Sequence, residues 1–201
     1  AALSGAMTVS DNSETGVTAT DLSTIGGATT GTVTVTNAVD ITGTATELTA
    51  ALVTTTSKVE VTAATVTISD ANNTSIAATV LSDIGSETTG TVTVTNAINV
   101  TGTADEAVAA LHTTGSKVEV TAATVTLSDD PTLTELKQLN AATTGAIKIN
   151  TQSKTYSGST ADLAAALAGT VTNNADAALS GAMTVSDNSE TGVTATDLST
   201  I

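Results

Sequence analysis

Short alternations of apolar and polar residues recur along the chain. In 32–36 (TVTVT) and 58–62 (KVEVT) every second residue is a valine, which is the pattern of a β-strand with one buried face. A second short alternation follows each of them, at 39–41 (VDI) and 66–68 (VTI). The apolar spacing then changes to that of a helix in 47–52 (ELTAAL) and 162–167 (DLAAAL). We therefore expect two short strands and a short helix in each turn of the chain.

The expected helix starts share one motif, a hydroxyl residue three positions before an acidic residue. In this capping-box spacing the hydroxyl and the carboxylate bond free backbone N–H groups of the first turn. The five pairs are Thr18 with Asp21, Thr44 with Glu47, Thr103 with Glu106, Thr132 with Glu135, and Ser159 with Asp162. A sixth helix, near 75–84, lacks the acid. The spacing of these starts predicts turns of about 29 residues, a length typical of repeat proteins.

The chain repeats itself at two scales. Residues 177–201 are identical to residues 1–25, an offset of 176 residues. Within this period TTGTVTVTNA occurs at 29–38 and 88–97, SKVEVTAATVT occurs at 57–67 and 116–126, and TTGAIKIN at 143–150 is a diverged third copy. We interpret 1–176 as one full tandem period of three units with two turns each, and 177–201 as the start of the next identical period. No separate globular domain is expected, and the chain is interpreted as a window from a longer array.

These repeats predict the fold. One strand–strand–helix turn cannot bury its own apolar face, whereas stacked turns can. We therefore expect a β-solenoid of parallel stacked coils with a short helix per coil, about six coils in each period. One column of the stack would contain, in order, Val33, Val59, Val92, Val118 and Ile147.

Composition limits the partners. The chain has 5 Lys and Arg together against 20 Asp and Glu, a net charge of −15, which excludes the basic surface that nucleic acids require. No apolar stretch is long enough to span a membrane. Phe, Trp and Cys are absent and Tyr156 is the single aromatic residue. At 40% hydrophobic residues the chain is nevertheless too apolar for a disordered acidic tail.

No enzyme chemistry is expected. The single histidine is His112, and the matching position of the preceding unit holds Val53. We therefore interpret His112 as a residue at a helix end rather than as a general base. Neither a nucleophile elbow nor a phosphate-binding glycine loop occurs. No catalytic or cofactor-binding residue is proposed.

Calcium is the one metal that the sequence brings into question. Oxygen-rich loops place Asp70, Asp129, Asp130, Asp187 and Glu190 as candidate Ca²⁺ ligands, because hard cations prefer such oxygen atoms. The glycine-rich nonapeptide of calcium-binding β-rolls is missing, however, and aspartate is also an ordinary turn residue. The prediction is therefore no metal and no cofactor, with calcium as the alternative.

Threonine rows such as Thr32, Thr34 and Thr36 are a pattern that ice-binding faces use. Charged residues interrupt the expected lattice in the neighbouring coils, where Lys58, Glu60, Lys117, Glu119 and Lys148 occupy the matching positions. Threonine also suits any solvent-facing strand. Ice binding therefore stays within a broader alternative, a ligand-binding module.

The run ATDLSTIGGATTGTVTVT at 19–36, followed by ITGTATEL at 41–48, resembles the threonine- and alanine-rich tandem repeats of giant secreted cell-surface proteins of marine bacteria, especially picocyanobacteria. Those proteins include haemolysin-type and adhesin-like members. The resemblance covers the whole chain. It implies secretion, an extracellular or cell-surface location, great length, and a structural or adhesive role.

The sequence thus predicts a structural repeat of an extracellular filament or giant cell-surface protein, forming a stiff, elongated β-solenoid fibre. Its partners would be adjacent copies of the same repeat, joined end to end, with lateral self-association as a further contact. The alternative is an adhesin or ligand-binding solenoid that recognises a glycan, a cell surface or ice.

Overall fold

The computed structural model describes residues 2–13, 15–113 and 115–187. Its helices are α1 Ala19–Ala28, α2 Ala45–Leu48, α3 Ala78–Ser86, α4 Ala104–Leu111, α5 Leu133–Ala142 and α6 Thr160–Leu167. Helix α2 continues into the π-helical turn Thr49–Val53 and the 3-10 turn Thr55–Ser57. The strands are β1 Met7–Val9, β2 Gly16–Thr18, β3 Val33–Val35, β4 Asp40–Gly43, β5 Val59–Val61, β6 Thr65–Ile68, β7 Ser75–Ala77, β8 Val92–Val94, β9 Asn99–Gly102, β10 Val118–Glu119, β11 Thr124–Leu127, β12 Ile147–Ile149, β13 Tyr156–Gly158, β14 Val171–Asn173 and β15 Met183–Val185.

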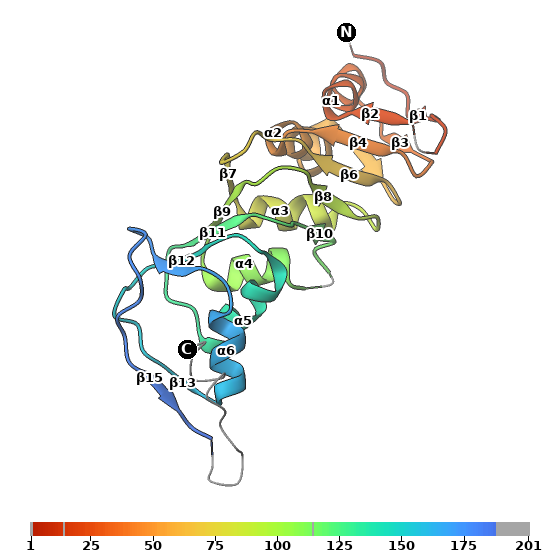
Figure 1. Cartoon of the computed structure of the whole chain (residues 1–201). Coiled ribbons are helices and arrows are strands. Elements are labelled where there is room, and N and C mark those ends of the chain that lie inside the picture. Colours follow the sequence, from red (N-terminus) through yellow and green to blue (C-terminus); the bar gives the residue numbers. More distant parts are fainter. Residues whose placement is uncertain (1, 14, 114, 188–201) are drawn as a thin grey trace.

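The described strands form four sheets, and their ladders are parallel. A three-stranded sheet has the order β1-β3-β5, and a five-stranded sheet the order β10-β8-β6-β4-β2. A second five-stranded sheet has the order β14-β12-β11-β9-β7, and β13 pairs with β15. Figure 1 shows β1 at one end of the molecule and β15 at the other, with the helices following one another beside the sheets.

The prediction of a β-solenoid is wrong, and the prediction of a fibre built from its coils falls with it. The chain has an α/β fold, in which parallel sheets of three, five and five strands combine with six helices in the described part. Strands of two to four residues bury few side chains each, so the helices supply much of the apolar contact. The strands are also divided among several sheets instead of forming continuous columns.

The pairing of the strands shows where the column breaks. Strand β3 lies beside β5, and β8 beside β10, as the valine pattern predicts. However, β8 pairs with β6 instead of β5, and β12 pairs with β11 instead of β10. Val92 therefore lies opposite Val66, and Ile147 lies opposite Val125. Strand β7, which follows β6 without a helix between them, starts a new sheet by pairing with β9.

The predicted helix starts are confirmed. At each of the five hydroxyl–acid pairs, the side chain of the cap residue accepts a hydrogen bond from the backbone N–H of the acidic residue. The reciprocal capping box is complete at Thr44, Thr103 and Thr132. Helix α3 begins after Ala77 without a side-chain cap, in agreement with the missing acid. The hydroxyl–acid pairs therefore place five of the six described helices, whereas the sixth, α3, begins only at Ala78, after strand β7.

The core lies between the sheets and the helices and consists of aliphatic residues together with Tyr156. Its largest fully buried side chains are Leu22, Ile41, Leu48, Ile68, Leu81, Ile84, Ile98, Leu127, Leu136, Leu139, Ile147 and Ile149. Two helix glycines bring the backbone of the next turn close: a Cβ on Gly26 would overlap the carbonyl oxygen of Ser57, and one on Gly85 that of Ser116. Small residues therefore set the short distance between turns.

Candidate functional site

The acidic loop residues bond helix starts. The Oδ2 atom of Asp70 accepts a hydrogen bond of 2.6 Å from the backbone N–H of Ala45, the first residue of α2. Thr44, the cap residue of the same helix, accepts from the N–H of Glu47. Two separate side chains thus satisfy two of the free N–H groups that begin a helix. The Asp70 side chain is buried, which protects this bond from water.

The same contact occurs at two further helices. Asp129 accepts from the N–H of Ala104 at 2.8 Å, and Asp187 accepts from the N–H of Thr160 at 2.7 Å. In all three cases the aspartate lies 25 to 27 residues after the helix residue that it bonds. We call Asp70, Asp129 and Asp187 the cross-turn cap aspartates. Each places a negative charge at the positive end of the helix dipole of the preceding turn.

The remaining calcium candidates do not complete a site. Asp130 accepts a hydrogen bond of 2.7 Å from the N–H of Thr151, which joins two loops. Glu190 lies outside the described residues. Among the residues that the structure describes, no group of three or more His, Cys, Asp or Glu side chains could hold a metal ion. The structure therefore separates the candidate ligands and gives each described one a backbone partner.

One carboxylate pair was not singled out from the sequence. Asp105 and Glu135 lie in the first turns of the neighbouring helices α4 and α5. A side-chain hydrogen bond with Glu135 and, next, the negative charge of Glu135 raise the pKa of Asp105 above its ordinary value, and Asp129 adds to the effect. The Thr132 cap holds the pKa of Glu135 below its usual range, chiefly by hydrogen bonding. The pair therefore stores a charge repulsion at neutral pH, which only the contact between turns could reveal.

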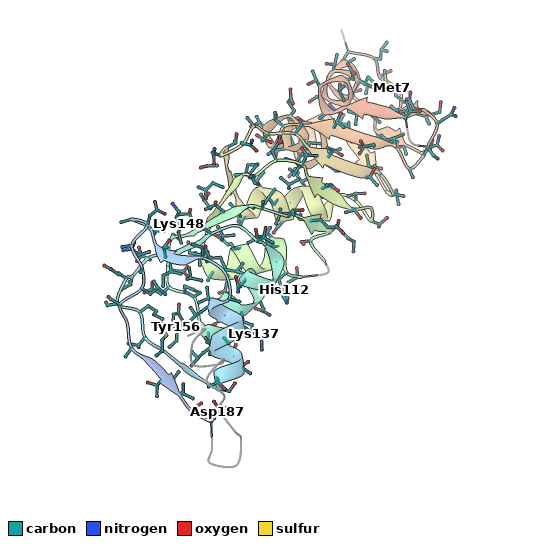
Figure 2. The ribbon with its side chains drawn as sticks, viewed as in Figure 1. Met7, His112, Lys137, Lys148, Tyr156 and Asp187 are labelled. Carbon is teal, nitrogen blue, oxygen red and sulfur yellow. The ribbon has the colours of Figure 1, made fainter. Side chains whose placement is uncertain are left out.

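His112 lies at a helix end, as predicted. It is the C-cap residue of α4, its backbone N–H bonds the carbonyl of Val108, and its side chain is exposed. It borders a surface hollow of about 380 Å³ together with Lys137 and Asp162. Lys137 Nζ lies 2.6 Å from Asp162 Oδ1, and this bond lowers the pKa of Asp162. Figure 2 shows His112 and Lys137 on this part of the surface.

A second hollow, of about 390 Å³, lies over α2 and the loop that leads to β7. Its lining includes Thr46, Thr49, Thr54, Thr74 and Val80. Asp70 also reaches its wall, where its carboxylate already bonds the helix start. The hollow thus offers threonine hydroxyls and methyl groups without a free acid.

Tyr156 does not contribute to the surface. Its side chain is buried, and its hydroxyl group has no hydrogen-bond partner among the described residues. Burial raises the pKa of the Tyr156 phenol. Lys154 Nζ lies 5.9 Å from the centre of the ring, within the range of a cation–π contact. Because this is the single aromatic residue of the chain, an exposed aromatic face for stacking on a sugar is missing.

The threonine rows are interrupted as the sequence predicts. Thr34 lies opposite Glu60, Thr93 opposite Glu119, and Thr126 opposite Lys148. These pairs put charged side chains beside threonines on the same sheet face, so a flat uncharged lattice does not form there.

No described helix has the length and apolar character needed to cross a membrane. Comparison of the chain with protein-family models, with curated proteins and with solved structures gives no match.

Proposed function

We propose that this chain is a structural repeat of a cell-surface protein, in which successive 176-residue periods stack end to end and serve as each other's partners. The observation that carries this proposal is the cross-turn cap. Each of the three aspartates completes the helix start of the turn before it. Three of the six described helix starts are therefore incomplete until the next turn has been added, as expected of a unit that works in a series.

The arrangement of the core supports the same role. Buried aliphatic residues continue from Leu22 near one end to Leu163 near the other. Backbone hydrogen bonds connect each turn to its neighbours, for example from Thr65 N to Val39 O and from Thr124 N to Ile98 O. Contacts of one kind are thus repeated along the molecule, which suits a role in building and spacing.

This role needs no catalytic group. The carboxylates of the three cross-turn cap aspartates bond backbone N–H groups at helix starts. The alternative role as an adhesive or ligand-binding module has less support. The two hollows lack an aromatic face, and the threonine rows are broken by charges. The extracellular location rests on the resemblance to secreted repeat proteins.

The proposal is tested in cells that produce the protein, with an antibody raised against this chain. We expect the antibody to label intact cells, and external protease to remove the signal. On a denaturing gel the recognised polypeptide should be several times larger than the 19.5 kDa of this chain. A band near 20 kDa that stays inside protease-treated cells would contradict the structural role.

A further inference from the structure

One stretch of sequence occurs at both ends of the described structure. Residues 2–11 and 178–187 are identical, and we call them the first and second junction segments. Among the described strands, β1 of the first segment pairs with β3 alone, and β15 of the second segment pairs with β13 alone. Met7 and Asp187 mark the two opposite ends in Figure 2. The same strand sequence therefore pairs with the following turn at one end of the molecule and with the preceding turn at the other end.

The exposed apolar residues lie where each segment lacks its second neighbour. Among the described residues the exposed large apolar side chains are Leu3, at 60%, and Val185, at 36%. Their counterparts Leu179 and Val9 are partly buried and packed against the core. For each exposed side chain, the identical residue of the other junction segment is thus partly covered by the rest of this chain.

The glycines of the junction segments show the same relationship. A Cβ on Gly181 would overlap the backbone of Lys154, whereas a Cβ on Gly5 would meet nothing within 4 Å. Gly31 packs against the other side of Gly5, where a Cβ added to Gly31 would lie 2.6 Å from the Gly5 backbone. Position 181 therefore requires a glycine, because the backbone of Lys154 packs directly against it. At the equivalent Gly5 no backbone occupies the corresponding position.

The aspartates complete the comparison. Asp187 caps the start of α6 through the N–H of Thr160. Its counterpart Asp11 is exposed, and within the described part of the chain no helix start donates to its carboxylate. The cross-turn cap is therefore present at one junction segment and unused at the other.

We propose that two copies of this chain join end to end through the junction segment. Strand β1 of one copy pairs with β13 of the other copy, in the place that β15 occupies within one chain. Asp11 then caps the N–H of Thr160 across the junction. Strands β13, β1, β3 and β5 thereby form one continuous parallel sheet. This inference rests on the proposed structural role and specifies the contact by which neighbouring periods meet.

Both halves of this interface are already visible. The second junction segment bonds the turn before it through Ser180 N to Gln152 O at 2.9 Å, Tyr156 N to Ala182 O at 3.2 Å, and Ser186 N to Gly158 O at 2.8 Å. In the joined state the identical residues Ser4, Ala6 and Ser10 of a second copy make these bonds. The first junction segment keeps its own bonds to the following turn, such as Met7 N to Thr32 O at 2.8 Å.

Between separate chains the two junction segments compete for β13. The second segment is held beside β13 by its own chain, at an effective concentration in the millimolar range, so it is the favoured occupant in dilute solution. Gly181→Ala weakens this occupant through the clash with Lys154. Gly5→Ala instead weakens the incoming segment of another copy and leaves the single chain unstrained. The two substitutions therefore act in opposite directions.

The test uses disulfide trapping in the full chain, which contains no native cysteine. Ser157 and Thr184 are register partners of β13 and β15, and Thr8 is the counterpart of Thr184. Neighbouring strands lie about 4.8 Å apart, within the range that a disulfide can bridge. In a Thr8→Cys, Ser157→Cys chain the two substituted positions lie at opposite ends, so cross-copy pairing predicts disulfide-linked oligomers after oxidation with diamide.

We expect a ladder of oligomers on a non-reducing gel, increased several-fold by Gly181→Ala and reduced to the control level by Gly5→Ala. Asp187→Ala, which removes only the cap on Thr160, should increase it as well. The control is Thr34→Cys with Ser157→Cys, because Thr34 is exposed on a strand that already has neighbours on both sides. Circular dichroism of each variant checks that the chain is folded.

Equal ladders in the folded Gly5→Ala and Gly181→Ala chains, or no ladder in the folded Asp187→Ala chain, would overturn the junction. These outcomes are separate from the cellular test. A large surface polypeptide without cross-copy trapping would keep the structural role and reject this contact. A clear ladder from a small intracellular protein would support the contact and reject the cell-surface role.

Discussion

Asp70 accepts a hydrogen bond from the backbone N–H of Ala45 at 2.6 Å, although the two residues are 25 positions apart. The bond joins the end of one turn to the helix start of the turn before it. Asp70→Ala should leave this N–H without a partner in a buried place and lower the free energy of unfolding by about 1–3 kcal/mol. Urea denaturation measures the change.

Asp83→Ala is the matched control for this prediction, because Asp83 is an exposed acid on α3. It removes the same charge without removing a cap, and its effect should stay within about 0.5 kcal/mol. If both substitutions lowered the stability equally, net charge rather than the cross-turn cap would be the cause.

Calcium should leave the stability unchanged. The carboxylates of Asp129 and Asp187 already bond helix starts, and an ion at either place would have to break the bond that it replaces. We expect the same melting temperature in millimolar calcium chloride and in a chelator, measured by circular dichroism at constant ionic strength. A rise in melting temperature that depends on calcium would instead support a calcium site at these aspartates.

Two adjacent glycines in α1 should respond in opposite ways to alanine. A Cβ on Gly26 would overlap the carbonyl oxygen of Ser57, whereas one on Gly27 meets nothing within 4 Å. Gly26→Ala should therefore destabilise the chain by about 1–3 kcal/mol, as overpacking does. Gly27→Ala should stabilise it by up to about 1 kcal/mol, since alanine is the better helix former. The denaturant midpoints of the two variants measure these changes. A loss of stability in both variants would show that the close packing against Ser57 is not what distinguishes Gly26 from Gly27.

Tyr156 should make the chain sensitive to alkali. Burial raises the pKa of its phenol in the folded state above the ordinary value, which is about 10. The folded state therefore holds the proton more tightly, and this contribution is present below about pH 10 and lost as the pH rises further. We expect phenolate absorbance and loss of circular dichroism to appear together.

Tyr156→Phe supplies the control for the alkaline transition. The buried hydroxyl has no partner among the described residues, so its removal should cost little stability at neutral pH. The variant should remain folded at a higher pH than the parent chain. Unfolding at the same pH in both chains would assign the transition to other groups.

The effect of Asp105 on the stability of the chain should depend on pH. Because Glu135 raises the pKa of Asp105 in the folded state, protonation of Asp105 favours folding, and this gain is lost as the pH rises through the raised pKa. Asp105→Asn should therefore increase the melting temperature at neutral pH, and the difference should shrink as the pH falls. In a Glu135→Gln background the same substitution should have little effect. A difference that persists at acidic pH would point to a cause other than charge repulsion.

Local patterns predicted local structure well. The hydroxyl–acid pairs place five helix starts, because a cap is made within one turn of the helix itself. The partner of a strand is not a local property. Val92 and Val94 alternate in the same way whether they face β5 or β6, so the alternation alone does not decide that β8 pairs with β6. The order of the strands in the sheets could therefore not be predicted from the sequence pattern.

The roles of the candidate calcium ligands depend on their partners for a similar reason. Asp70 and Asp129 were placed in the right loops, yet an aspartate followed by polar residues suits a turn, a helix cap or a calcium ligand equally well. What distinguishes these roles is the group that lies opposite, 25 residues earlier in the chain. The recurrence of Ser-Asp at 10–11, 69–70, 128–129 and 186–187 is the signal that could have pointed to a contact between turns.

The start of a new sheet at β7, and again at β13, has a geometric consequence. Each added strand rotates a sheet by roughly 20–25°, so the total twist of a sheet grows with the number of its strands. Here no described sheet has more than five strands, so the twist that builds up within one sheet is limited to those strands. Dividing the strands among several short sheets thus limits the twist that any one of them accumulates as turns are added.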